Sequence, residues 1–127
     1  MKVLVDTHVF LWAIAGSPKL SKKHRALWVD EASELYLSFA SVWEMLIKAG
    51  LKRLPLPAPH SRYIFRQMER NRLTYLGARP AHFAELDSLP PLHRDPFDRM
   101  LVAQARAEGI PIATVDPMLR RYRVDVL

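Results

Sequence analysis

The chain has 127 residues, the length of one domain, and half of them are hydrophobic. That balance excludes a disordered or fibrous protein. No apolar run approaches the ~20 residues of a membrane-spanning helix, and Asp6 interrupts any signal-peptide core, so we expect a cytoplasmic protein with no membrane partner. Cysteine is absent, which excludes disulfides, thiol catalysis and zinc–thiolate sites. The formal net charge of +6 favours a polyanionic partner, most often nucleic acid.

Short apolar runs alternate with helical patterns along the chain. Residues 3–5 read Val-Leu-Val, a buried-strand pattern that ends at an aspartate. Apolar residues between positions 39 and 47 recur at helical spacing. In chain order, we expect a strand at 3–5, helices at 7–15 and 21–32, a strand at 35–38, helices at 39–50 and 60–72, a strand at 73–76, helices at 79–89 and 95–108, and strands at 112–115 and 123–126. This alternation predicts an α/β fold with a central parallel sheet flanked by helices on both faces.

Two of the expected strands end in an aspartate. Asp6 follows the first strand, and Asp116 follows the strand at 112–115. In open α/β sheets, sites form beyond the carboxyl ends of the strands, so both residues should lie at one edge of the sheet. Aspartate is also a favoured cap of a helix or turn, so each residue taken alone fits a cap as well as a site.

Three further acidic residues lie on the expected helices. Asp95 fits the N-cap of the helix at 95–108, and Asp98 fits its third position. Asp98 shares a helix face with Leu101, which should pack inward, so its carboxylate must be paired, protonated or bound to a cation. By spacing alone, Glu44 is better interpreted as half of a solvent-edge pair with Lys48.

Carboxylates from separate elements that meet at one sheet edge would repel one another unless a cation lay between them. The five histidines show no H-E-x-x-H spacing and cysteine is absent, so oxygen ligands favour Mg²⁺ or Mn²⁺. Such a cation activates water and holds a phosphate for in-line attack. A basic protein with an acidic metal site is suited to cutting a polyanion.

Four segments occur in an order and spacing that one known family shares. They are 5–12 (VDTHVFLW), 41–48 (SVWEMLIK), 93–105 (HRDPFDRMLVAQA) and 113–117 (ATVDP). On these segments the chain resembles the PIN-domain ribonucleases, and specifically the VapC toxins of toxin–antitoxin pairs. Each segment alone would be weak evidence, but the four together are specific and cover nearly the whole chain. The resemblance implies a single PIN domain over residues 1–127.

The resemblance also implies an activity: a Mg²⁺- or Mn²⁺-dependent endoribonuclease that hydrolyses RNA phosphodiester bonds. Carried over by position, its catalytic and metal-binding residues are Asp6, Glu44, Asp98 and Asp116. Asp6 and Asp98 would be the most direct ligands, Glu44 would ligate the metal or orient the attacking water, and Asp116 would complete the site. Asp95 would be a lesser member, because capping explains it well.

Further expectations follow from the same resemblance. Thr7 and Thr114 are expected to hold carboxylates by hydrogen bonds, and Arg94 and Arg99 to meet substrate phosphates. The family implies a homodimer and a cognate VapB-like antitoxin whose tail blocks the active site. Three tryptophans could contact a partner or the second subunit, although residues of this type usually pack in the core: Trp12, Trp28 and Trp43. Three arginines on one helix face could contact RNA, although such a face is usually only solvated: Arg62, Arg66 and Arg70.

Three alternatives belong to other functional classes. A receiver-like phosphoacceptor needs an acidic pair near the first strand and an acceptor after a middle strand, and the strand at 35–38 ends without an acid. A non-catalytic nucleic-acid-binding module would account for the charge but not for Asp98 on an apolar helix face. A DNA nuclease would share the metal chemistry, and only cleavage assays separate it from a ribonuclease.

Overall fold

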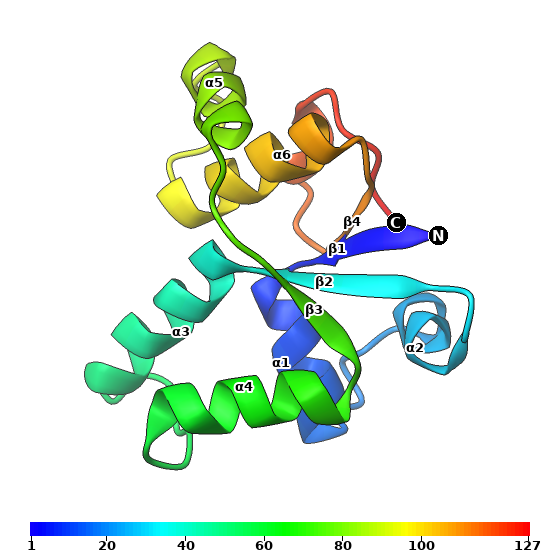
Figure 1. The fold of residues 1–127 in the computed structure, drawn as a ribbon, viewed down its shortest axis with the longest axis vertical. Helices are drawn as coiled ribbons and strands as arrows, with labels where there is room; N and C mark the ends of the chain where they lie inside the picture. Colours follow the sequence, from blue (N-terminus) through cyan, green and yellow to red (C-terminus); the bar gives the residue numbers. More distant parts are fainter.

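A four-stranded, all-parallel sheet with the strand order β3-β2-β1-β4 lies between two layers of helices (Figure 1). The computed structural model describes residues 1–127. The strands are β1 (Lys2–Val5), β2 (Glu34–Ser38), β3 (Leu73–Leu76) and β4 (Ile112–Ala113). The helices are α1 (Thr7–Ala15), α2 (Lys22–Val29), α3 (Phe39–Gly50), α4 (His60–Arg70), α5 (Pro80–Ser88) and α6 (Pro96–Glu108), followed by a 3₁₀ turn, η1 (Leu119–Arg121). The expected α/β class is confirmed.

The central strand, β1, is buried on both faces. Val3, Leu4 and Val5 are fully buried, as expected of a strand with helices above and below it. Val3 and Val5 belong to the core cluster beneath α1, α3 and α4, whereas Leu4 belongs to the cluster beneath α6. Figure 1 shows the same division, with α5 and α6 on one side of the sheet and α1 to α4 on the other.

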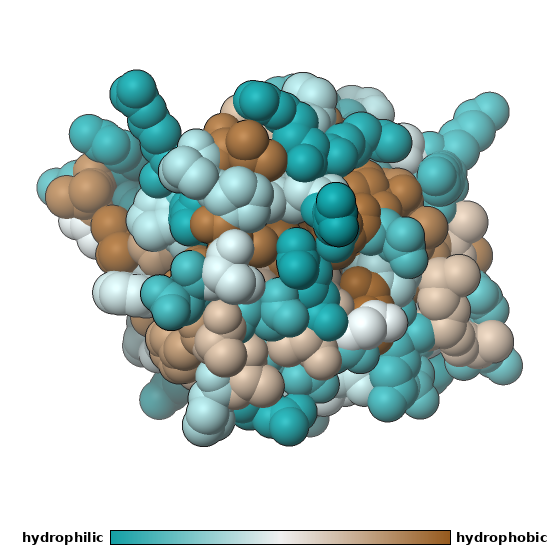
Figure 2. Space-filling view, turned by 90° about the horizontal axis from the view of Figure 1, so that it is seen from above, coloured by the Kyte–Doolittle hydropathy of each residue, from teal (hydrophilic) through white to brown (hydrophobic).

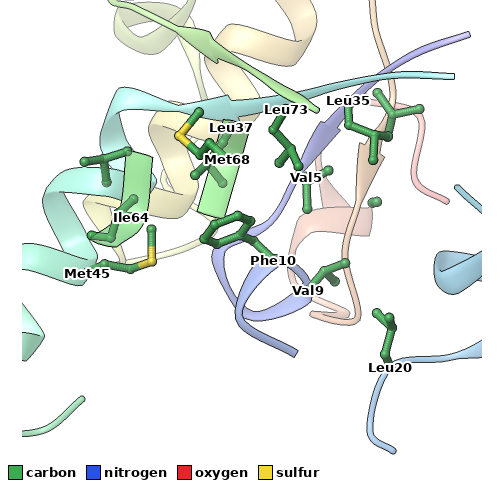
Figure 3. Packing of buried hydrophobic residues seen from close by; sticks show 13 residues of the cluster. Val5, Val9, Phe10, Leu20, Leu35, Leu37, Met45, Ile64, Met68 and Leu73 are labelled. Carbon is green, nitrogen blue, oxygen red and sulfur yellow. The ribbon is translucent and has the colours of Figure 1, made fainter. Parts of the chain in front are cut away.

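The larger core is built around Phe10 of α1. Its ring lies among side chains from the sheet and from α3 and α4, including Val5, Met45 and Ile64 (Figure 3). Close packing of an aromatic ring in such a position is worth several kcal/mol of stability. The packing fixes α1 against the carboxyl end of β1, and therefore fixes the position of Asp6 between the two elements.

Helix ends follow the expected local chemistry. Ser21 and Ser38 cap α2 and α3 by accepting backbone hydrogen bonds from His24 and Ala40. The α6 helix ends at Gly109, which adopts φ +67°, a left-handed conformation that glycine takes without strain. None of the helices combines the length and apolarity needed to cross a bilayer.

Three expected boundaries are wrong. The strand at 112–115 is limited to Ile112–Ala113, and the strand at 123–126 is reduced to one isolated parallel bridge, Ile112–Val126. This terminal segment forms the outermost edge of the sheet, where Arg123 and Asp125 are exposed and no further strand pairs with it. The α2 helix ends at Val29 because the Asp30 carboxylate accepts hydrogen bonds from Ala32 and Ser33, which form a turn instead.

Candidate metal centre

Acidic side chains from three elements gather at the carboxyl edge of the sheet. Asp6 leaves the end of β1 and is 3% exposed, and Glu44 of α3 is 4% exposed. Asp98 lies in the first turn of α6 with 15% of its side chain exposed. Burial, then the negative charges of Asp6 and Asp95, raise the pKa of Asp98 to about 7, and Glu44 adds to this repulsion. These carboxylates are therefore close enough to act on one another, as the sequence predicts.

Thr114 connects the two aspartates that follow strands. Its hydroxyl donates a hydrogen bond to Asp6 Oδ2 and accepts one from the backbone N–H of Asp116 at 3.1 Å. Burial raises the pKa of Asp6, and the hydrogen bond from Thr114 opposes that rise. The parallel pairing of Val5 with Ala113 brings Asp6 and Thr114 together across neighbouring strands. Thr114 therefore holds a carboxylate, as expected.

Asp116 lies at the margin of the group, with 30% of its side chain exposed. Its Oδ1 accepts a hydrogen bond from the backbone N–H of Met118 at 2.9 Å, which stabilises the turn after β4. Its Oδ2 lies 3.1 Å from Nε2 of His93. Both of its oxygens therefore already have partners within the protein.

His93 is the residue that the sequence analysis did not single out. Its Nε2 lies 3.0 Å from Asp98 Oδ2 as well as 3.1 Å from Asp116 Oδ2. Its Nδ1 faces the backbone N–H of Asp95 at 3.1 Å. His93 lies in the segment between α5 and α6, where no periodicity predicts the direction of a side chain, and its place in the HRDPFD motif is the one signal in the sequence.

The interpretation of Glu44 as a residue at the solvent edge is wrong. The expected pair with Lys48 is present, with Lys48 Nζ 2.7 Å from Glu44 Oε2, but Glu44 is buried rather than at the solvent edge. Trp43, the preceding residue, is 57% exposed instead. The ring of Trp43 meets Phe97 edge to face at 5.5 Å, between α3 and α6.

Asp95 caps α6 as the sequence predicts. Its Oδ1 accepts hydrogen bonds from the backbone N–H groups of Phe97, at 2.8 Å, and Asp98, at 3.3 Å. Through its charge, Asp95 also contributes to the raised pKa of Asp98. Its contacts are those of a helix cap that lies beside the carboxylate group.

Thr7 and Arg99 have partners of their own within the protein. The hydroxyl of Thr7 donates to Ser41 at 2.8 Å and joins α1 to α3, whereas its backbone hydrogen bond supports the Asp6 carboxylate. Nη1 of Arg99 donates to the carbonyl of Pro90 at 3.0 Å and also to Tyr122. Arg94, in contrast, is exposed beside the site.

The remaining candidates for partner or RNA contacts differ in how exposed they are. Trp12 is half-buried and lines a groove of about 620 Å³ between α1, α3 and residues 53–56, and Trp28 is half-buried at the end of α2. The arginines of α4 form an exposed, solvated face at positions 62, 66 and 70. Figure 2, which views the molecule from another side, shows mostly hydrophilic residues with smaller hydrophobic areas among them.

The donor chemistry of the group fits a hard divalent cation. Asp6, Glu44 and Asp98 offer carboxylate oxygens and no soft ligand, and Lys48 is the cation paired with one of them. Burial and mutual repulsion raise the pKa values of Asp6 and Asp98, so positive charge among these groups would favour their ionised forms. These three residues could hold a metal ion. His93, Asp98 and Asp116 form a second such group, because they offer three ligand atoms within 4.8 Å of one another.

Comparisons with known proteins agree with this architecture. The chain is 30% identical over 122 residues to Ribonuclease VapC22 of Mycobacterium tuberculosis, an alignment that covers 95% of this chain and 92% of that protein. It is similar in structure to VapBC2 from Rickettsia felis bound to a promoter DNA fragment, with a TM-score of 0.76, 13% identity and coverage of 100% and 98%. It is also similar to VapBC-1 from nontypeable Haemophilus influenzae, with a TM-score of 0.70, 17% identity and coverage of 100% and 97%. Residues 3–125 match the family model of the PIN domain. Because that match spans nearly all of the chain, this protein belongs to the PIN-domain family.

Proposed function

We propose that this protein is a metal-dependent endoribonuclease that acts as the toxin of a type II toxin–antitoxin pair. The observation that carries the proposal is the group of buried, mutually repelling carboxylates, Asp6, Glu44 and Asp98, at the sheet edge of a PIN-domain chain. The 30% identity to Ribonuclease VapC22 over most of both chains supports RNA as the substrate. An RNA substrate supports a cytoplasmic location for this activity.

We assign Mg²⁺ or Mn²⁺ to Asp6, Asp98 and Glu44, with Asp116 completing the site and Asp95 as a peripheral member. When bound, the cation supplies positive charge against the scissile phosphate and makes a water molecule more acidic. Asp6 is fixed for binding by the hydroxyl of Thr114.

Basic side chains beside the carboxylates would hold the RNA backbone. Glu44 is held by Lys48 through Oε2, which leaves Oε1 to orient the attacking water. Lys48 is itself partly exposed, and Arg94 is exposed next to the site. We infer that these two exposed cations contact phosphates of the RNA backbone, in a protein with a net charge of +6.

The partner that we propose is a VapB-like antitoxin that occupies the groove beside the carboxylates. Several similar structures are named as pairs, VapBC2, VapBC-1 and FitAcB. The groove of about 620 Å³ has an apolar lining that includes Leu11 and Trp12, and a basic rim that includes Lys19 and Arg53. A partner segment with apolar and acidic side chains suits it. We also propose a homodimer, in keeping with the family.

A cleavage assay tests the activity. Purified protein is incubated with a mixed RNA pool and with DNA of the same sequences, in Mg²⁺, in Mn²⁺ and in EDTA. We expect metal-dependent cuts in RNA, reduced at least 100-fold in Asp6→Asn and Asp98→Asn. Asp87→Asn, which changes an exposed carboxylate on α5, is the matched control and should cut like the wild type.

The outcomes separate the functional classes. Cleavage of DNA in preference to RNA would replace the ribonuclease with a DNA nuclease. RNA binding with no saturable Mn²⁺ site would favour the non-catalytic binding module, although that function leaves the buried Asp98 unexplained. Cleavage that persists in both site variants would contradict the assignment of the carboxylates.

The toxin role needs a test in cells. Expression of the wild-type chain should arrest growth, and Asp98→Asn should not, when both proteins accumulate to the same level. Arrest that is equally strong with the variant would show that toxicity does not depend on the carboxylate group.

A further inference from the structure

The two ring nitrogens of His93 have different partners. Nε2 lies 3.0 Å from Asp98 Oδ2 and 3.1 Å from Asp116 Oδ2, whereas Nδ1 lies 3.1 Å from the backbone nitrogen of Asp95. The side chain is 17% exposed. His93 therefore joins three acidic residues of the site, and the proposed function gives it no role.

These contacts fix which nitrogen carries the proton. The backbone amide of Asp95 can only donate, so Nδ1 must accept and must be free of hydrogen. Nε2 then carries the hydrogen and donates it to Oδ2 of Asp116. The imidazole is then a neutral ring that donates from Nε2.

This tautomer does not suit a direct metal ligand. His93, Asp98 and Asp116 offer three ligand atoms within 4.8 Å of one another, which is a spacing that a metal ion could use. A ligating Nε2 would need its lone pair, and the hydrogen would then have to sit on Nδ1, opposite the N–H of Asp95. Direct ligation would therefore cost the hydrogen bond that orients the ring.

We propose that His93 is a positioning residue that acts through Asp116 and Asp98. Its Nε2–H donates to Oδ2 of Asp116, and Nε2 lies 3.0 Å from Oδ2 of Asp98, so the ring ties the two carboxylates together and leaves Oδ1 of Asp98 for the cation. Donors of this kind orient a ligand and increase its metal affinity. The proposal rests on the proposed metal site and goes beyond it by giving a role to a residue outside the acidic set.

The loop that carries His93 is fixed independently of the ring. The backbone N–H of His93 donates to the hydroxyl of Tyr122 at 2.9 Å. Arg99 donates to Pro90 and to the same tyrosine, and Tyr122 is buried. Substitution of the ring should therefore leave the loop in place, which makes the role of the donor testable.

Two substitutions separate the donor from the ring. His93→Phe keeps an aromatic ring and removes both nitrogens, whereas His93→Gln loses the ring and keeps an amide N–H at about the same distance from the backbone. His60→Phe, the same change at the start of α4, is the matched control. Calorimetry with MnCl₂ then gives the metal affinity of each folded variant, and thermal unfolding checks that each one folds.

We expect His93→Phe to weaken Mn²⁺ binding about 10- to 100-fold, His93→Gln to remain within a few-fold of the wild type, and His60→Phe to equal it. Equal affinity in His93→Phe and the wild type, or a loss as large in His93→Gln as in His93→Phe, would overturn the positioning role. A wild-type protein that binds no Mn²⁺ would overturn it as well.

Two spectroscopic readouts do not depend on RNA cleavage. Long-range ¹H–¹⁵N spectra of the metal-free protein at pH 8 should show the hydrogen of His93 on Nε2. Spin-echo spectra of bound Mn²⁺ should show no directly coordinated ¹⁴N. A hydrogen on Nδ1, or a coordinated nitrogen that is lost in His93→Phe, would make His93 a ligand and refute the proposal. If all these results hold and no RNA is cut, the positioning role stands and the ribonuclease function fails.

Discussion

We expect Asp98→Asn to make the metal-free protein more stable at neutral pH. Burial and the charges of Asp6 and Asp95 raise the pKa of Asp98 from 3.8 to about 7 in the folded protein. In the unfolded chain this carboxyl ionises at its ordinary pKa, so between these two values each rise in pH favours the unfolded state. Asparagine has nearly the same shape and no charge, so it removes this cost.

The size of the effect follows from the two pKa values. One pKa unit corresponds to about 1.36 kcal/mol, so the change from 3.8 to about 7 corresponds to about 4 kcal/mol above pH 7. The substitution also weakens the contact with His93, so we expect about half of this gain, or about 2 kcal/mol, at pH 8. For a chain of this length the melting temperature should rise by about 6 to 12 °C. The gain should shrink as the pH falls below 7, become small near pH 4, and vanish only well below 3.8, where the carboxyl is protonated in both the folded and the unfolded state.

Thermal unfolding in EDTA at pH 4, 6 and 8 measures this difference. Asp87→Asn, an exposed carboxylate on α5, is the control and should melt with the wild type at each pH. The reasoning would be refuted if Asp98→Asn were no more stable than the wild type at pH 8. It would also be refuted by a gain of equal size at pH 4 and pH 8, because a charge effect must follow the ionisation of Asp98.

Three further predictions concern the same group. Millimolar Mg²⁺ or Mn²⁺ should raise the melting temperature of the wild type and leave that of Asp98→Asn nearly unchanged, since a ligand at 100 times its Kd adds about 2.7 kcal/mol of stability. If calorimetry finds that the metal does not change the melting temperature of the wild type, a preformed site is contradicted. Thr114→Val should weaken Mn²⁺ binding about tenfold, because it removes the hydrogen bond to Asp6, and titration calorimetry that finds equal affinity would count against this role. Asp95→Ala should lower the free energy of unfolding by about 1 kcal/mol, because the helix cap is missing. Asp95→Asn keeps the cap and should be at least as stable as the wild type. Urea unfolding that finds Asp95→Asn less stable than Asp95→Ala would contradict this reasoning.

The parts of the site that follow regular elements could be predicted from the sequence. Asp6 follows a strand of three apolar residues, and its position at the sheet edge needs only the parallel topology of an α/β fold. Asp95 precedes a proline at the first helical position, which is a strong local signal for a cap. Asp98 then follows from helical geometry, since its face is the one that packs inward.

The orientation of α3 could not be predicted in the same way. Trp43 and Glu44 are neighbours on a helix, about 100° apart around its axis. Hydrophobicity favours burial of the tryptophan, yet Trp43 is exposed and Glu44 is buried. The carboxylates of Asp6 and Asp98, on elements distant in the sequence, lie on the side of the helix that Glu44 faces. A local pattern contains no information about that tertiary contact, and the i, i+4 pair with Lys48 fits a buried or an exposed glutamate equally.

The acidic residues of the site differ in how completely the protein satisfies them, and this difference indicates where a cation is needed. Asp116 has partners for both oxygens, and Asp95 accepts two backbone hydrogen bonds. These two residues are stable as a turn and a cap without a metal ion. Burial raises the pKa of Asp6 in spite of its hydrogen bonds, and burial together with neighbouring carboxylates raises the pKa of Asp98. On electrostatic grounds a cation would therefore contribute most at Asp6 and Asp98, and less at Asp116 and Asp95, which the protein already satisfies.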